Sequence, residues 1–195
     1  MKKIGPLVII LVILGVFVLW AIGAYNRLVN MDEAVSKQWA DVENVYQRRA
    51  DLIPNLVATV KGYAEHERET FTAVTEARSK ASSITVDPTK LNAESLQQFQ
   101  AAQDGLSSAL SRLLVVVERY PDLKANQNFL DLQAQLEGTE NRISVERSKF
   151  NDAARAYNTA IRRIPGSIVA ALFGFDQRPY FEAAEGSDEA PKVEF

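Results

Sequence analysis

Residues 4–25 have the sequence IGPLVIILVILGVFVLWAIGAY, which contains no charged side chain. A helix needs about 20 apolar residues to cross the roughly 30 Å hydrocarbon core of a bilayer, so this run is long enough. Trp20 and Tyr25 stand near its end, and aromatic rings of this kind settle at membrane interfaces. The stretch therefore predicts a transmembrane anchor over residues 1–25.

A cleaved signal peptide is the alternative, because Ala21-Ile22-Gly23 is similar to a small-residue cleavage site. Signal-peptide cores usually run about 7–15 residues, and the greater length here favours a retained anchor. Lys2 and Lys3 precede the span. The positive-inside bias then predicts a cytoplasmic N-terminus and an extracytoplasmic body.

Beyond the anchor, apolar residues recur at alternating steps of three and four, the spacing of one helix face. The pattern predicts long helices over residues 28–81, 92–119 and 126–164. Apolar stripes joined by short turns bury one another. We therefore expect an all-α fold in which the transmembrane helix continues into an extended antiparallel bundle of three long helices, over residues 26–175.

Pro54 leaves an alternative open inside the first of these helices. A proline forfeits the hydrogen bond to the carbonyl four residues back, here Ala50, and usually bends the axis. The first helix is thus either continuous from the membrane to Ala81 or broken at Ile53-Pro54.

Residues 167–175, SIVAALFGF, are too few to span a bilayer, and we expect a short C-terminal helix there. The segment either packs on the bundle or forms a hydrophobic patch for a partner or a membrane surface. Residues 176–195 are predicted to be an acidic, disordered tail, because residues 182–195 hold five acids and one lysine.

The composition argues against several kinds of chemistry. The 195 residues include 22 Lys and Arg against 25 Asp and Glu, so the basic excess of a nucleic-acid-binding protein is missing. The chain has no cysteine and one histidine, His66, which excludes a cysteine-based zinc site or thiol nucleophile. His66-Glu67 begins like a metalloprotease motif, but Thr70 stands where the second histidine belongs. We expect no enzyme, no cofactor, no metal and no nucleic-acid partner.

The best candidate for a role beyond packing is the cluster of Arg48, Arg49 and Asp51 beside Pro54-Asn55. Arg49 falls in the apolar register, where a charge must be paired or solvated. We expect an acid of another helix, such as Glu146, to pair with it. A contact between subunits is the alternative.

Three further positions are candidates for contacts between molecules. Gly138 lies inside a predicted helix, where glycine costs about 1 kcal/mol relative to alanine. It marks either a close crossing of two helices or the approach of a partner's backbone. Trp39 and Tyr46 lie on the stripe near the membrane, and we expect them to remain after intramolecular packing and to contact neighbouring subunits.

Several stretches, taken in their order along the chain, resemble sequences of the LemA family. They are QRRADLIPNLV at 47–57, TVKGYAEHE at 59–67, YPDLKAN at 120–126, LEGTENRI at 136–143 and FGF at 173–175. The resemblance extends from Tyr25-Asn26 to about Phe181. It implies a bacterial protein with one N-terminal span and a helical bundle. It supplies no reaction and no catalytic residue.

Two classes of function follow, both at the bacterial inner membrane with a periplasmic body. The first is a structural or scaffolding protein. Identical anchored helices meet at high effective concentration in one membrane, so this class predicts a homo-oligomer larger than a dimer. The second is a ligand-binding bundle or accessory subunit that serves a membrane protease, transporter or enzyme. It predicts a monomer or dimer with an enclosed pocket between its helices.

Overall fold

The computed structural model describes residues 5–182. Its elements are the helices α1 (Pro6–Lys61), α2 (Arg68–Ser83), α3 (Ala93–Val117), α4 (Pro121–Lys124), α5 (Gln127–Arg162) and α6 (Gly166–Phe173), with a short 3-10 turn, η1 (Pro88–Lys90). The described residues contain no β-strand. The predicted all-α class is confirmed.

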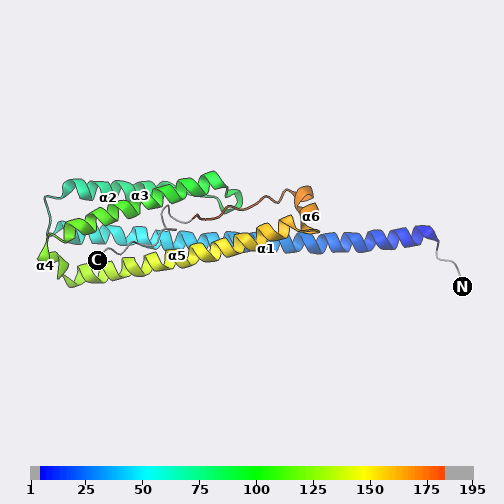
Figure 1. Cartoon of the computed structure of the whole chain (residues 1–195), viewed down its shortest axis with the longest axis horizontal. Helices are drawn as coiled ribbons and strands as arrows, with labels where there is room; N and C mark the ends of the chain where they lie inside the picture. Colours follow the sequence, from blue (N-terminus) through cyan, green and yellow to red (C-terminus); the bar gives the residue numbers. More distant parts are fainter. Residues whose placement is uncertain (1–4, 183–195) are drawn as a thin grey trace, which may run out of the picture.

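Four of these helices form an antiparallel bundle in which successive long helices run in opposite directions (Figure 1). Helix α1 packs along α5, and α2 packs along α3. Helix α6 crosses the end of the bundle at which α1 emerges, and the N-terminal part of α1 extends alone beyond it (Figure 1).

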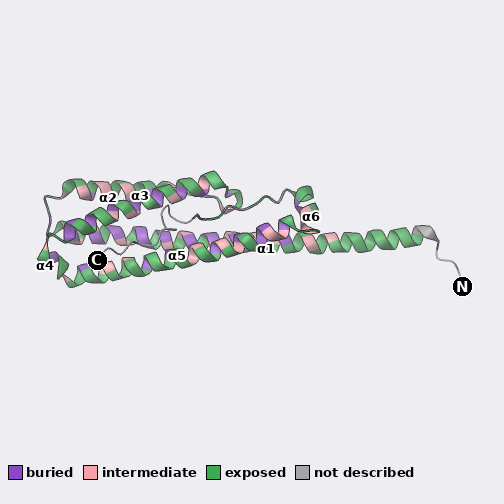
Figure 2. Ribbon diagram, viewed as in Figure 1, coloured by how far each residue is buried: buried purple, intermediate pink, exposed green. Residues whose placement is uncertain are grey.

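The protruding part of α1 is the one helical stretch in residues 5–182 that is long and apolar enough to cross a membrane. Its large apolar side chains between Val8 and Ile22 are all exposed, from 41 % at Trp20 to 71 % at Leu19 (Figure 2). Apolar side chains on every side of a helix suit contact with lipid. This arrangement indicates membrane anchoring through α1.

The prediction of one helix over residues 28–81 is wrong, because α1 ends at Lys61 and the chain reverses over residues 62–67. The Gly62 amide caps the helix by donating to the Ala58 carbonyl at 3.3 Å. Buried apolar residues recur on both sides of the reversal, including Val60, Ala64 and Phe71. The spacing therefore continues through the turn and conceals it, and the bundle has four long helices instead of three.

Pro54 lies inside α1 without breaking it. Proline has no amide hydrogen to donate, so the Ala50 carbonyl loses its usual partner. Arg78 of α2 replaces that partner, with its Nε donating to the Ala50 oxygen at 2.7 Å. The alternative of a break at Ile53-Pro54 is excluded, and the replaced bond also joins α2 to α1.

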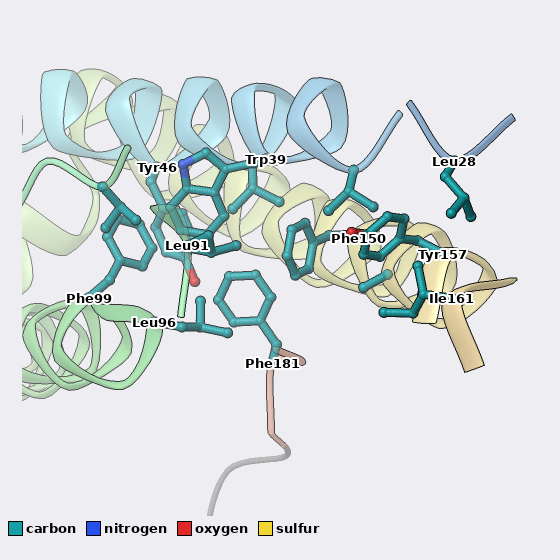
Figure 3. Packing of buried hydrophobic residues seen from close by; sticks show 14 of the residues in the cluster. Leu28, Trp39, Tyr46, Leu91, Leu96, Phe99, Phe150, Tyr157, Ile161 and Phe181 are labelled. Atoms are coloured by element: carbon teal, nitrogen blue, oxygen red, sulfur yellow. The ribbon is translucent and has the colours of Figure 1, made fainter. Parts of the chain in front are cut away.

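Two hydrophobic cores fill the bundle. The core nearer the candidate span, called the proximal core, is drawn in Figure 3. It contains Leu28, Val35, Trp39, Val42, Tyr46, Val86, Leu91, Leu96, Phe99, Ile143, Phe150, Ala154, Tyr157, Ile161, Val169, Ala170 and Phe181. The distal core contains Ile53, Leu56, Val60, Ala64, Phe71, Val74, Ala81, Leu106, Ala109, Leu113, Val117, Leu123 and Phe129.

Trp39 and Tyr46 are buried in the proximal core, which corrects the prediction that they contact neighbouring subunits. The Trp39 ring lies 5.2 Å from that of Phe99, 5.8 Å from Phe150 and 6.0 Å from Phe181 between centroids. Phe181 points into this cluster from the C-terminal segment (Figure 3). Helix α3 and that segment therefore cover the two aromatic side chains.

Two glycines shape the region around α6. A Cβ at Gly166 would lie 2.1 Å from the Ala160 carbonyl oxygen, so only glycine permits this close return of α6 onto α5. Gly174 ends α6 with a φ of +74°, in the left-handed region that glycine adopts without strain. The predicted short C-terminal helix is confirmed, and it packs on the bundle through Val169 and Ala170.

The bond at the proline gives the first prediction. Arg78→Ala should lower the free energy of unfolding by about 1.5 kcal/mol, because it strands the Ala50 carbonyl. In a Pro54→Ala background a backbone amide can bond that carbonyl again, so the same substitution should cost about half as much. Denaturant unfolding of the four variants in detergent measures the coupling, with Arg68→Ala as the exposed control on α2. Equal costs in the two backgrounds would contradict this explanation.

Candidate functional site

A polar layer centred on Arg49 separates the proximal core from the distal core. Arg49 is 2 % exposed. Its Nη1 donates to Glu140 Oε2 of α5 and to Ser107 Oγ of α3, each at 3.0 Å. Its Nη2 donates to the side-chain oxygen of Gln103 at 2.6 Å and to the Gln103 carbonyl at 3.3 Å. The guanidinium thus binds two helices besides its own.

The predicted register of Arg49 is confirmed, whereas the predicted partner is wrong. Glu146 pairs with Lys149 on its own helix at 2.9 Å. The antiparallel register of α1 and α5 instead brings Glu140 to Arg49, and the Glu140 side chain is 59 % exposed. The buried end of this ion pair is therefore the cation, and the acid reaches solvent.

Tyr46 lies beside the layer, with its ring centroid 5.1 Å from the Arg49 guanidinium carbon. Burial raises the pKa of the Tyr46 phenol, although the positive charges of Arg147 and Arg49 act in the opposite direction. The phenol thus stays protonated within the core.

Asp51, Pro54 and Asn55 are exposed on the outer side of α1. The Asp51 carboxylate accepts a hydrogen bond from the Gln47 side chain at 2.8 Å. These three residues do not join Arg49 in one site, because Arg49 points into the bundle.

Gly138 is exposed on α5, and a Cβ built there would meet nothing within 4 Å. The interpretation of Gly138 as a close crossing of two helices within the molecule is therefore wrong. The backbone at Gly138 faces open space.

A second polar site lies at the proximal end, beside a cavity of about 430 Å³ lined by Asp32, Tyr157 and Arg178 among others. Arg178 donates to both oxygens of Asp32, with Nε to Oδ1 at 2.9 Å and Nη2 to Oδ2 at 3.0 Å. Its Nη1 donates to the carbonyls of Pro88 and Thr89 at 3.1 and 3.2 Å. One guanidinium thus joins the C-terminal segment to α1 and η1.

Burial raises the pKa of Tyr157 to about 12, and the negative charge of Asp32 adds to the effect. The phenol is therefore a poor proton donor at this cavity. Among residues 5–182, no cluster of three or more acidic or histidine side chains is placed to hold a metal ion.

Two asparagines of α5 fix residues 176–182 in an extended path, which corrects the prediction that this part of the tail is disordered. The Asn158 side chain accepts from the Arg178 amide and donates to its carbonyl, both at 2.8 Å. Asn151 makes the same pair of bonds with Phe181, at 2.8 and 3.0 Å. Residues 183–195, the rest of the predicted tail, lie outside the described residues.

The C-terminal strap, meaning residues 174–182, is not predicted by the sequence pattern. One signal was available: Asn158 follows Tyr157 directly, next to the apolar register of α5. A buried asparagine must find hydrogen-bond partners, and an extended backbone offers both a donor and an acceptor.

A helix that leaves a candidate membrane span and continues through a bundle defines a membrane protein with a helical body. The LemA family model matches residues 38–195, most of the chain. The chain belongs to the LemA family.

Among known relatives, the chain is similar to magnetosome protein MamQ of Magnetospirillum gryphiswaldense. The identity is 26 % over an alignment 207 residues long, which covers 94 % of this chain and 75 % of the relative. It is also 26 % identical to magnetosome protein MamQ 2 of Paramagnetospirillum magneticum, over 84 % of this chain and 66 % of that protein. Protein LemA of Metamycoplasma hominis is 26 % identical over 172 residues, covering 88 % of this chain and 75 % of the relative.

The polar layer gives the second prediction. Arg49→Ala should lower the free energy of unfolding by about 3 kcal/mol, because it removes charge-assisted bonds and strands the buried Gln103. Arg48→Ala, exposed at the neighbouring position, should change it by less than about 0.5 kcal/mol. Urea unfolding in detergent compares the two variants. Similar losses would show that the buried charge contributes little.

The strap gives the third prediction. Arg178→Gln should release residues 174–182, because the ion pair with Asp32 and two carbonyl contacts are lost. Hydrogen exchange measured by mass spectrometry should rise there while the distal core stays protected. Arg155→Gln, which breaks an exposed pair with Asp152 on α5, is the matched control. Unchanged protection of the strap in Arg178→Gln would refute its anchoring role.

Proposed function

We propose that this LemA family protein is a non-enzymatic scaffold of the bacterial inner membrane that self-associates through the outer face of α5 around Gly138. The observation that carries the proposal is the unbroken course of α1 from the candidate span through the bundle. A helix of 56 residues is about 80 Å long. The span and the body therefore move as one stiff unit.

The face around Gly138 supports lateral association of such units. Leu130 and Val145 flank Gly138 on α5 and are 41 % and 51 % exposed. The pairing of Glu140 with Arg49 places this face level with residue 49 of α1. That is roughly 35 Å along the helix from Tyr25 at 1.5 Å per residue. Parallel bodies standing on one membrane would bring these faces to the same height.

The assignment as a scaffold agrees with the roles of two arginines, the buried Arg49 and the partly buried Arg178. Arg49 and Arg178 both hold helices or the strap in place. In the proposal, the lysines before the span stay in the cytoplasm and the body stands in the periplasm, in keeping with the positive-inside bias.

The alternative function is a ligand-binding or accessory subunit. The observation that favours it is the cavity of about 430 Å³ beside Asp32 and Arg178. A ligand held there would be bound by a single body, so this alternative predicts no dependence of function on Gly138.

The fourth prediction tests the α5 face. Gly138→Leu should reduce cross-linked oligomers in native membranes roughly tenfold, because the side chain blocks approach of a second backbone. The fold should tolerate the change, since nothing lies within 4 Å of the added Cβ. An amine-reactive cross-linker applied to membranes, followed by gel electrophoresis, measures the distribution of oligomers.

Gly105→Leu is the matched control, because Gly105 is an equally open and exposed glycine on α3. It should leave the oligomers unchanged. Only monomers and dimers in the native protein, or equal loss in both variants, would defeat the scaffold proposal.

A further inference from the structure

Helix α6 lies where α1 passes from the bundle to the candidate span (Figure 1). The Tyr25 ring contacts Phe173 at 4.9 Å and Phe175 at 5.6 Å between centroids. Tyr25 follows the apolar run directly. Aromatic rings at this position settle at the interface between hydrocarbon and water. The geometry therefore puts α6 at the height of the lipid headgroups.

The side of α6 that faces away from the bundle is apolar. Ile168 is 47 % exposed, Leu172 is 74 % exposed and Phe173 is 60 % exposed, whereas Val169 and Ala170 face the core. Ile164, at the corner before α6, is 83 % exposed. Exposed apolar side chains that gather in this way mark an interaction surface.

A groove of about 510 Å³ lies on the same end of the molecule, between α1 and the corner at Ile164. Trp20 and Ala24 of α1 line it, together with the side chains of Arg27 and Arg163. Both arginines are exposed, and neither forms an ion pair with any residue in the described range. The groove thus combines apolar walls with two positive charges.

We propose that α6 and the Ile164 corner rest in the bilayer interface, and that Arg27 and Arg163 bind the phosphate of an acidic lipid headgroup in the groove. The apolar side chains of α6 enter the region between headgroups and acyl chains, as those of interfacial helices do. Guanidinium groups suit phosphate, which they bind through paired hydrogen bonds.

The surface formed by α6 and the groove is continuous with the exposed apolar surface of α1, and this identifies the bilayer as its occupant. The apolar side chains of α6 and the groove adjoin the exposed apolar surface of α1, which faces lipid in an anchored molecule. The positive charge of the groove complements the negative charge of acidic lipids. The protein therefore contacts the membrane at two places, through its span and through α6, and the second contact limits tilting of the body.

The absence of cysteine allows a direct test in the full-length protein. A fluorophore on Leu172→Cys is compared with one on Val115→Cys, which is 68 % exposed near the end of α3 and outside the proposed α5 face. Both are reconstituted in vesicles of equimolar phosphatidylglycerol and phosphatidylcholine. Lipids that carry a spin label in the upper acyl chain should quench residue 172 several-fold more than residue 115, and an aqueous quencher should show the reverse order.

Equal aqueous quenching at the two positions would overturn the proposal. So would shielding of residue 172 from both quenchers that disappears on dilution into excess lipid, because a second protein copy would then cover α6.

The groove is tested by lipid retention in nanodiscs of the same mixture. Native mass spectrometry should show preferential retention of phosphatidylglycerol over phosphatidylcholine. Each of Arg27→Gln and Arg163→Gln should reduce that preference about fivefold. Arg48→Gln, exposed on the bundle part of α1, should leave it unchanged. Equal retention of the two lipids by the native protein, or equal effects of all three variants, would overturn the headgroup assignment.

Discussion

The desolvated guanidinium of Arg49 is the constraint on which the alignment of the bundle depends. Apolar side chains tolerate small shifts along a helix axis, because neighbouring methyl groups are nearly equivalent partners. A buried cation does not tolerate such a shift, because it must meet its hydrogen-bond acceptors or remain unpaired in a medium of low polarity. Arg49 meets its acceptors on α3 and α5 in one register only, and its layer lies between the two cores. Fixing α1 against α3 and α5 also fixes how far each part of the body lies from the membrane.

Polar side chains form hydrogen bonds with backbone groups at two places where the chain departs from regular helix geometry, Pro54 and the C-terminal strap. Arg78 supplies the donor that Pro54 lacks, which keeps α1 straight enough to link the span to the body. Asn151 and Asn158 supply donors and acceptors to a strap that pairs with no strand among residues 5–182. In each case one side chain satisfies backbone groups that would otherwise be buried without partners. The result is a rod whose stiffness comes from several specific bonds as well as from apolar packing.

The sequence predicted the span, the all-α class and the burial of Arg49. Each of these depends on a local pattern, either an apolar run or the spacing of apolar residues along one helix. It did not show the reversal at residues 62–67, since the apolar spacing of α1 continues into α2. The partner of Arg49 depends on the register between α1 and α5, which neither helix determines alone. Trp39 was predicted to remain exposed because its cover comes from α3 and from Phe181, both distant in sequence. Gly138 shows the reverse: the sequence marked it as unusual, and only the structure shows that it faces open space.

The stacking of Phe181 on Trp39 has a consequence for the order of folding. The two residues are made near opposite ends of translation, and a ribosome adding about 5–20 residues per second needs roughly 7–28 s to pass from one to the other. Until Phe181 has been made, the Trp39 ring lacks one of its three aromatic neighbours. The distal core can close earlier, because its last contributor is Phe129. We therefore expect the distal core to form before the proximal core, whose last contributor in chain order is Phe181.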